Sequence, residues 1–336
     1  MSSPANSWQS FLSSQGAQFN ASGEAAFPAT TASAQLFDLS SNGLIAISGA
    51  DSQTFLQGQV TNDIKLLAQG AQFNGYCTPK GRLLALFFSF TIAEVIYLQC
   101  PRALIPDLVK RLRMYVLRSK VLVEDASERL VALGLASDTL ATTMEALPAT
   151  PYQQAQTPHG TLIRLADTGA QQRALLVAAS EQAQASWQAL SATFTPNSTS
   201  QWEALEIQAG IPQVYAATKE QFVPQMVNLD ALNGINFKKG CYTGQEIVAR
   251  THYLGKVKRR TLLAQLTSEH APQPGDVLLD AQQQEAGQLV RVAPAAGNTW
   301  WVLAECRLES KEAGPVSWQQ AVLQWHPLPY INPDKE

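Results

Sequence analysis

The sequence predicts an α+β protein that has more than one domain and ends in a small antiparallel β-barrel. A chain of 336 residues with 46% hydrophobic residues can bury more than one core. In the first part of the chain the local signals follow the order strand, helix, strands, helix, strand, which is the split βαβ arrangement of α+β domains. After Gly255 short apolar runs alternate with Gly and Pro, a pattern typical of a barrel of short strands.

The first elements follow from turn and cap signals. Residues 1–34 are polar and rich in Ser, Ala and Gly, which predicts a flexible leader. Asn42-Gly43 is the favoured two-residue hairpin turn, so a strand before it and a return strand over 44–47 are expected. Asp51 can cap one helix, and Pro106 suits the first turn of a second. Further strands are expected at 72–77, 83–90, 95–99 and 120–124.

A second, similar run follows and then gives way to the barrel. It comprises strands at 130–135, 161–165 and 174–177 and helices at 181–193 and 201–209. The barrel strands are expected at 261–266, 277–279, 287–293, 299–304 and 320–325. The sequence therefore predicts three parts, namely the leader 1–34, an α+β core 35–255 and a barrel domain 256–336.

Composition and charge exclude several classes of protein. A net charge of −3 gives no whole-protein attraction for nucleic acid, so direct nucleic-acid binding is not indicated. The four cysteines, at 77, 100, 241 and 306, lack the paired spacing of a disulfide framework or a metal site, and no metal is expected. The N-terminus lacks a signal-peptide pattern, and the most apolar segment, 83–98, is too short and interrupted to span a bilayer. These features predict a cytoplasmic protein with no membrane partner.

Residues 238–246, Lys-Lys-Gly-Cys-Tyr-Thr-Gly-Gln-Glu, are the stretch whose residue types most need a chemical explanation. Thr243 and Glu246 have the spacing of a capping box, which predicts a helix from Gly244 onward through Gln245. Cys241 would then lie just before a helix N-terminus, where unpaired amides favour negative charge.

The neighbours of Cys241 point the same way. Lys238 and Lys239 add positive charge, while Gly240 and Gly244 let another group approach the backbone. Together these features favour an accessible, reactive thiolate. The alternative, which local chemistry leaves open, is a small inert thiol buried in a glycine-rich turn.

The same stretch carries a family resemblance. Residues 239–246, Lys-Gly-Cys-Tyr-Thr-Gly-Gln-Glu, resemble the hallmark of the YgfZ-type folate-binding proteins, relatives of the T-protein (aminomethyltransferase) of the glycine cleavage system. The hallmark includes Lys239, Gly240, Tyr242, Gly244, Gln245 and Glu246 around Cys241. Supporting motifs occur at 48–52, 57–63, 79–82, 115–121, 209–212 and 222–225.

The resemblance implies a fold and a cofactor. The fold would be two interwoven T-protein-like α+β units around a central folate channel, followed by the barrel, and the ligand would be tetrahydrofolate or a one-carbon derivative. Trp202 matches the aromatic that stacks on the pterin, although a Trp opening a helix is most often a core residue. Gln208 stands where many relatives have a Glu that holds the pterin edge, and Asn42 replaces a second aromatic found in some members.

One departure bears on catalysis. T-proteins follow the turn at Gly81 with a run ending in a catalytic Asp, whereas residues 81–85 here read Gly-Arg-Leu-Leu-Ala. Without a carboxylate near the folate nitrogen, aminomethyl chemistry lacks its proton-transfer group. The resemblance therefore implies an accessory protein that supports iron–sulfur enzymes, including tRNA-modifying ones, with Cys241 as the functional thiol. A one-carbon transferase of the T-protein type and a non-catalytic scaffold with a vestigial pocket are the alternatives.

Two basic clusters, 110–120 and 256–260, complete the inventory. Charge runs of this kind usually mark a solvated face, and an anionic partner is the alternative. His252 is expected to be an ordinary surface residue.

Overall fold

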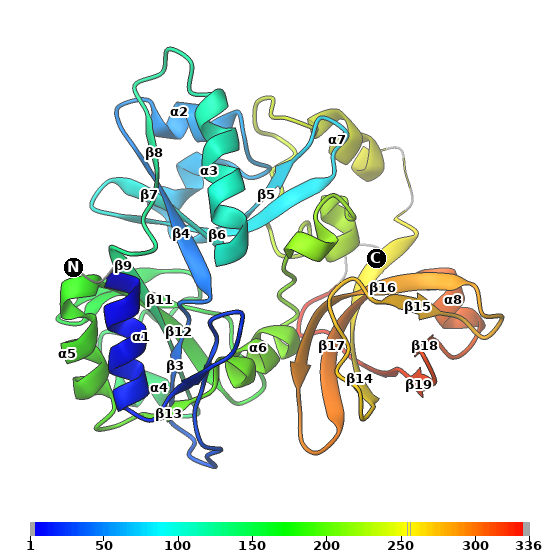
Figure 1. Ribbon diagram of the computed structural model, residues 1–336. Helices are drawn as coiled ribbons and strands as arrows, with labels where there is room; N and C mark the ends of the chain where they lie inside the picture. Colours follow the sequence, from blue (N-terminus) through cyan, green and yellow to red (C-terminus); the bar gives the residue numbers. More distant parts are fainter. Residues whose placement is uncertain (1–3, 254, 256, 332–336) are drawn as a thin grey trace. The chain divides into compact units, whose positions relative to one another are not determined.

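The computed structural model describes residues 4–253, 255 and 257–331 (Figure 1). The chain forms two compact units, each built from three segments. Unit 1 is Met1–Ser52, Leu66–Ala71 and Ser89–Trp202, and unit 2 is Gln53–Lys65, Gln72–Phe88 and Glu203–Glu336. Among the residues described, none of the helices combines the length and apolar character that a membrane span requires.

Unit 1 contains a six-stranded sheet in the order β10-β11-β12-β9-β3-β13. Its strands are antiparallel except β13, which pairs in parallel with β3. The bounds are β3 Gln35–Asp38, β9 Leu130–Ser137, β10 Gln154–Thr157, β11 Gly160–Arg164, β12 Gln172–Ala179 and β13 Thr195–Asn197. The expected pairing of the strands near 161–165 and 174–177 is confirmed, because β11 and β12 are neighbours.

The helices of unit 1 are short and cover apolar side chains. They are α1 Pro4–Ser14, α3 Ile105–Met114, α4 Leu140–Thr143 and α5 Ser180–Leu190, with a 3-10 turn η2 at Arg102–Leu104. α3 begins next to Pro106 as expected and buries Leu108 and Leu112 against β4 Asn42–Ser48 and β8 Leu122–Asp125. β7 Val95–Pro101 pairs with β4 on its other side.

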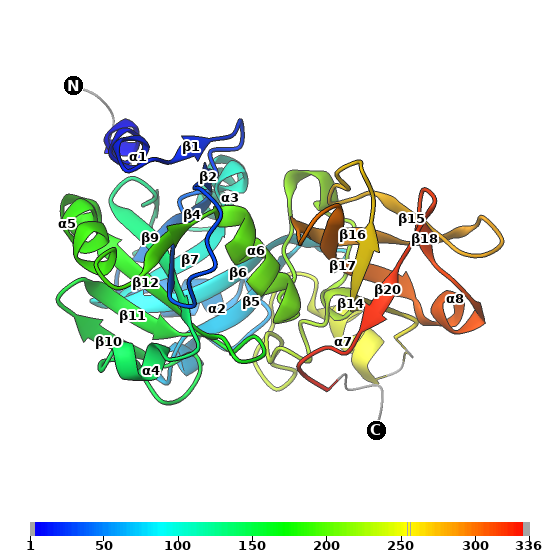
Figure 2. The same cartoon turned by 90° about the horizontal axis from the view of Figure 1, so that it is seen from below.

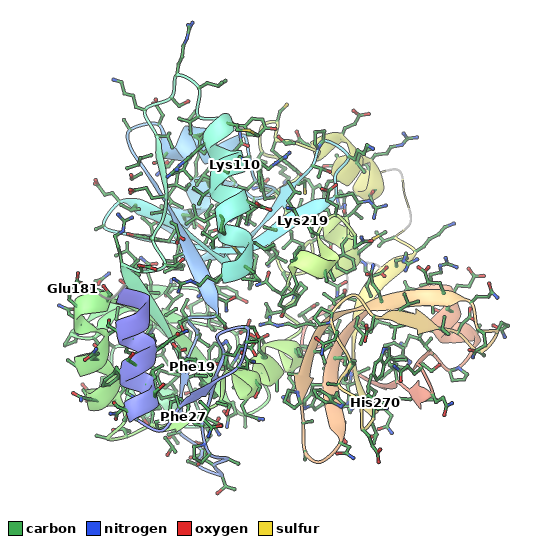
Figure 3. The ribbon with its side chains drawn as sticks, viewed as in Figure 1. Phe19, Phe27, Lys110, Glu181, Lys219 and His270 are labelled. Carbon is green, nitrogen blue, oxygen red and sulfur yellow. The ribbon has the colours of Figure 1, made fainter. Side chains whose placement is uncertain are left out.

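The expectation of a flexible N-terminal leader is wrong for the part of it that the structure describes. α1 packs Trp8 and Leu12 into the same core as Trp187 of α5, and the Trp8 indole N–H donates to the buried Asp38 carboxylate at 2.9 Å. β1 Gln18–Phe19 and β2 Ala25–Ala26 then pair, and Phe27 stacks on Trp187. Phe19 and Phe27 are labelled in Figure 3. The mostly polar composition of this segment predicted disorder, but its few apolar residues pack into the core and order it.

The expected hairpin at Asn42-Gly43 is also wrong. β3 and β4 belong to different sheets, and Asn42 is the first residue of β4, paired with Pro101 of β7. A tight turn is present, but it lies at Leu39–Asn42, where the Asn42 N–H donates to the Leu39 carbonyl at 3.0 Å. The dipeptide signal located a chain reversal correctly and assigned the wrong strand partner.

Several elements begin in one unit and end in the other. They are α2 Ser52–Gln57, the 3-10 turn η1 Ile64–Ala68, β6 Leu83–Ile92 and α6 Thr199–Gln208. In unit 2, β5 Gln72–Cys77 is followed by a turn at Thr78–Gly81 that leads into β6. The strands expected at 72–77 and 83–90 are thereby confirmed.

The C-terminal part of unit 2 is a nearly closed, barrel-like antiparallel sheet of seven strands in the order β19-β18-β15-β16-β17-β14-β20 (Figure 2). Its strands are β14 Arg259–Thr267, β15 Val277–Leu279, β16 Glu285–Pro294, β17 Thr299–Arg307, β18 Ser317–Trp318, β19 Ala321–Val322 and β20 Gln324–His326. Other elements of unit 2 are η3 Ala216–Thr218, η4 Pro224–Val227, α7 Gln245–Tyr253 and α8 Leu308–Ala313. The barrel is confirmed, and the boundary expected at residue 256 stays a prediction.

Two arginines of the second basic cluster are not part of a solvated face, whereas Lys258 is exposed as expected. Arg260 is fully buried and forms a two-pronged ion pair with Asp230, with N–O distances of 2.7 and 3.0 Å. Arg259 pairs in the same way with the buried Glu305 of β17. Lys256, from the same cluster, lies outside the described residues.

Candidate functional site

The loop that carries the hallmark motif is fixed from inside unit 2 by one lysine. The Lys239 side chain is only 8% exposed, and its ammonium donates three short hydrogen bonds to main-chain carbonyls. The acceptors are Gln57 at 2.7 Å, Val60 at 2.6 Å and Asn62 at 2.9 Å. These carbonyls lie at and just after the C-terminal end of α2, where helical carbonyls lack internal partners. Lys239 therefore joins the hallmark motif to the motif at 57–63.

This contact changes the role of the lysine pair. The two lysines were expected to add positive charge beside Cys241, but the Lys239 ammonium is engaged by carbonyls and packs 5.1 Å from the Tyr242 ring. Burial lowers the pKa of Lys239 to about 8, and the Asp63 carboxylate opposes this shift. Lys238 is exposed and is the lysine of the pair that faces solvent.

The residues after α2 also hold the approach to the loop. The buried Thr61 hydroxyl donates to the Gly234 carbonyl at 2.6 Å, and the Asn62 amide donates to the Asn233 carbonyl at 2.7 Å. The Asn236 N–H in turn donates to the Thr61 carbonyl at 3.0 Å. The motif at 57–63 therefore holds the segment that precedes Cys241 through these hydrogen bonds.

The turn before β6 packs directly on the other end of the loop. Gly244 has a φ of +83°, and a Cβ on it would lie 2.4 Å from the Thr78 carbonyl oxygen. Gly81 has a φ of +70°, and its Cβ would lie 2.8 Å from Ile247. Only glycine meets both demands at low cost. Gly244, expected to admit another group to the backbone, admits the protein's own turn.

α7 follows this contact. The helix begins at Gln245, one residue after the expected start, and the Gln245 N–H donates to the Tyr242 carbonyl at 3.2 Å. The carbonyl of the buried Val248 accepts from the side-chain amide of the fully buried Gln225 at 2.7 Å. Glu246 is exposed in the first turn of α7. A fourth motif, 222–225, thus supports the same helix.

Cys241 is an exposed residue of this loop. A Cβ on the neighbouring Gly240 would meet no atom within 4 Å apart from its own chain neighbours, so the space at Gly240 is open. All four cysteines are among the described residues, and Cys77, Cys100 and Cys306 are buried whereas Cys241 is exposed. Burial raises the pKa of the Cys77 thiol to about 12 and is the main cause that raises that of Cys306 to about 11. Cys241 is the thiol that a partner in solution can reach.

Three aromatic side chains near the loop, Phe237, His252 and Tyr253, contact one another, although the sequence did not predict this. The Phe237 and His252 rings stack with centroids 3.7 Å apart and planes 10° apart, and Tyr253 contacts His252 edge-on at 4.7 Å. His252 and Tyr253 are both exposed. His252 was expected to be an ordinary surface residue, and it is exposed but stacked. Fifteen residues separate Phe237 from His252, and no short-range pattern predicts that contact.

Trp202 lies in α6, on the six-stranded sheet of unit 1. Its indole is 3% exposed and packs so closely over Gly134 of β9 that a Cβ there would lie 2.6 Å from the ring. The Phe37 ring is 5.4 Å away, and the Arg173 guanidinium lies 5.6 Å from the indole centroid. In this conformation the ring is mostly covered by protein. The pterin-stacking role stays a prediction, and it requires a covering side chain to move.

The other two expected ligand contacts are placed separately. Gln208 ends α6, and its side-chain amide donates to the Ala204 carbonyl of the same helix at 3.1 Å. Six residues of helix turn Gln208 about 120° away from Trp202, so the two side chains leave α6 in different directions. Asn42 borders a small cavity of unit 1 together with Trp8 and Arg102. Their folate-binding roles also stay predictions.

The described residues contain no group of three or more His, Cys, Asp and Glu side chains placed to hold a metal ion. The loop itself presents an exposed thiol next to a glycine, on a main chain fixed by buried hydrogen bonds.

Comparison with solved structures assigns the fold. The chain aligns with the crystal structure of the glycine cleavage system aminomethyltransferase T from Bartonella henselae with a TM-score of 0.73, 17% identity and coverage of 96% of each chain. The protein thus has the α+β fold of the T-proteins with its C-terminal barrel-like sheet, as the sequence predicted.

Comparison with known sequences assigns the family. The chain is 34% identical over 276 residues to the tRNA-modifying protein YgfZ of Yersinia pseudotuberculosis serotype IB (strain PB1/+), covering 80% of this chain and 83% of that protein. It is 33% identical over 271 residues to the protein of the same name from Hamiltonella defensa subsp. Acyrthosiphon pisum (strain 5AT), covering 78% of this chain and 80% of that protein. No family model matches the chain. The chain belongs to the YgfZ family.

Proposed function

We propose that this protein binds tetrahydrofolate or a one-carbon derivative and supports iron–sulfur enzymes, and through them tRNA modification, with Cys241 as its functional thiol. It acts in the cytoplasm, and its partners are folate and iron–sulfur proteins that include tRNA-modifying enzymes. The observation that carries the proposal is the position of Cys241, exposed on a loop whose flanking residues are fixed by buried hydrogen bonds.

The arrangement supports a chemical role for Cys241. Three other motifs, at 57–63, 79–82 and 222–225, contribute to holding the loop, yet none of the described hydrogen bonds that hold it uses the thiol. A cysteine needed only for packing is normally buried, as the other three are. The relatives named tRNA-modifying proteins supply the process, and the T-protein fold supports folate as the ligand class.

The proposal is tested first at the thiol. In the native protein, iodoacetamide should modify Cys241 well before the buried cysteines, and mass spectrometry of peptides gives the order. Cys241→Ala should fold and bind folate but fail to restore tRNA modification in a strain lacking its own YgfZ. Cys306→Ala, which removes a buried thiol, is the matched control and should complement once it is shown to fold. Full complementation by Cys241→Ala would remove the thiol from the mechanism.

Folate binding is tested separately by calorimetry with tetrahydrofolate and its one-carbon forms. Trp202→Ala should weaken binding at least several-fold, because ring stacking contributes roughly 1 kcal/mol beyond area burial. Trp202 is buried, so the variant must first be shown to fold by circular dichroism, and Trp187→Phe, in a different part of the unit 1 core, controls for a general loss of stability. Unchanged affinity in a folded Trp202→Ala protein would exclude the stacking role.

A non-catalytic scaffold is the second candidate, and the burial of Trp202 favours it. A scaffold would show no measurable folate affinity and would tolerate Cys241→Ala. The two experiments above therefore separate it from the proposed function.

A further inference from the structure

One surface of unit 1 exposes apolar side chains to an unusual degree. Among the described residues, ten large apolar side chains are exposed, and four of them fall in a stretch of nine residues. They are Met114 at 60%, Tyr115 at 38%, Leu117 at 87% and Leu122 at 52%. The stretch is the loop between α3 and β8, which extends beyond both elements in Figure 1. Lys110–Leu122 is called the basic tip below.

The basic tip carries charge opposite to that of the whole chain. Residues 108–123 contain five basic residues and no acidic one, although the chain has a net charge of −3. Lys110, on α3 in Figure 3, and Arg113, Arg118 and Lys120 are exposed. Arg111 is half-buried, with its guanidinium 5.9 Å from the Tyr115 ring. Because most of these charges lie in solvent, they do not form a buried network that would explain them structurally.

The backbone of the basic tip is strained at its most exposed residue. Leu117 has a φ of +48°, a region that a bulky residue rarely adopts, and it gains little packing in return. The surrounding loop is anchored, since the Lys120 N–H donates to the Asp51 carboxylate at 2.7 Å. Gly49, at a φ of +106°, lets the Lys120 carbonyl approach so closely that any Cβ there would collide with it. Strain held in place by its surroundings is typical of a functional segment.

The chemistry of the surface selects the kind of partner. The exposed aliphatic side chain of Leu117 can insert into an apolar pocket of a partner. The surrounding Arg and Lys side chains can pair with carboxylates at the edge of that pocket. A bilayer would require the apolar face of α3, but Leu108, Val109 and Leu112 of that face are buried in unit 1. Single-stranded RNA would require aromatic platforms, and the exposed apolar side chains here are mainly aliphatic.

We propose that the basic tip is a docking surface for an acidic protein, whose apolar pocket receives Leu117 while its carboxylates pair with Arg118 and Lys120. This inference uses only unit 1 residues outside the loop of Cys241, so it stands independently of the proposed function.

The first experiment places a photo-crosslinking amino acid at Leu117 of the full-length protein in cells. The matched position is Val322 of β19, which is 52% exposed in unit 2. We expect position 117, and not 322, to cross-link to a protein at an acidic surface. Cross-links to lipid, to RNA or to nothing at position 117 would overturn the proposal.

The second experiment measures the affinity of that purified partner by calorimetry. Arg118→Glu and Leu117→Asp should each weaken binding about tenfold or more, and added salt should weaken it further, whereas Val322→Asp should bind as the wild type does. Unchanged affinity in both tip variants would overturn the proposal. Leu117→Gly should leave the urea midpoint unchanged or raise it, because glycine relieves the strain. A midpoint lowered beyond what the added unfolded-state entropy of glycine explains would show that Leu117 stabilises the fold, and would also overturn the docking role.

Discussion

Lys239 shows how a residue of the hallmark motif can act through the fold and not through chemistry. Its ammonium satisfies three carbonyls that belong to a segment about 180 residues earlier in the chain, one pair being 182 residues apart. A charged hydrogen bond inside a protein is worth more than a neutral one, and an acceptor left without a donor is costly. Loss of Lys239 should therefore loosen the loop that displays Cys241.

We predict that Lys239→Met lowers the free energy of unfolding by about 2–4 kcal/mol, since the methionine fills the space but donates no hydrogen bond. The measurement is urea unfolding followed by circular dichroism near neutral pH. Lys238→Met, at the exposed neighbour, is the control and should change stability by less than about 0.5 kcal/mol. Equal effects of the two substitutions would mean that the three hydrogen bonds contribute nothing to stability.

The two glycines around Cys241 should behave differently when replaced by alanine. Gly244→Ala meets the Thr78 carbonyl at a positive φ and should cost about 2–4 kcal/mol in unfolding experiments. Gly240→Ala meets no atom within 4 Å and should fold with nearly wild-type stability. If Gly240→Ala nevertheless fails to complement, the open space at Gly240, next to Cys241 in the chain, is used by a substrate or partner. Marked destabilisation by Gly240→Ala would contradict this account of the loop.

At the scale of elements, the strands β5, β7 and β17 each bury one thiol, namely Cys77, Cys100 and Cys306. Burial is the main cause that raises the pKa of each above its usual value of about 9. Above pH 9 the unfolded chain loses thiol protons that the folded protein retains. The stability that these thiols contribute is therefore complete below pH 9 and is lost as the pH rises through the folded pKa values.

We predict that under reducing conditions the Cys306→Ala variant loses less stability than the wild type between pH 8.5 and 11. The folded pKa of Cys306 is about 11, so the difference should reach about 2–3 kcal/mol at the upper end. Urea unfolding of both proteins across this range measures it, and the comparison cancels the titration of lysines and tyrosines. Parallel curves for the two proteins would show that Cys306 titrates alike when folded and unfolded.

For the whole molecule, the T-protein fold raises the question of whether T-protein chemistry is retained. The positions that follow Gly81 are Arg82, Leu83, Leu84 and Ala85, and the last three are buried in β6. These three apolar side chains offer no acid or base to a folate nitrogen. Similarity of fold at 17% identity does not by itself transfer an activity.

We predict no aminomethyl transfer from a lipoyl carrier protein to tetrahydrofolate in a reconstituted glycine cleavage assay. An authentic T-protein in the same assay is the positive control. Turnover above the no-enzyme rate by this protein would require another proton-transfer group and would revive the transferase alternative.

The sequence by itself determined the local elements and the family of this protein. Apolar runs marked the barrel strands, and the residues from Lys239 to Glu246 carried the resemblance. Both signals are short-range. A strand is predicted by the pattern of neighbouring residues, and a motif is a contiguous run of residues.

Only the tertiary structure decided what the motif residues do. It buried Lys239 and Arg260, exposed Cys241, ordered the segment from α1 to β2, and moved Asn42 from a hairpin turn into a sheet with β7. Each of these outcomes depends on contacts between residues tens to hundreds of positions apart. Such contacts form because buried polar groups must find partners wherever the fold supplies them, and no local pattern records where those partners are.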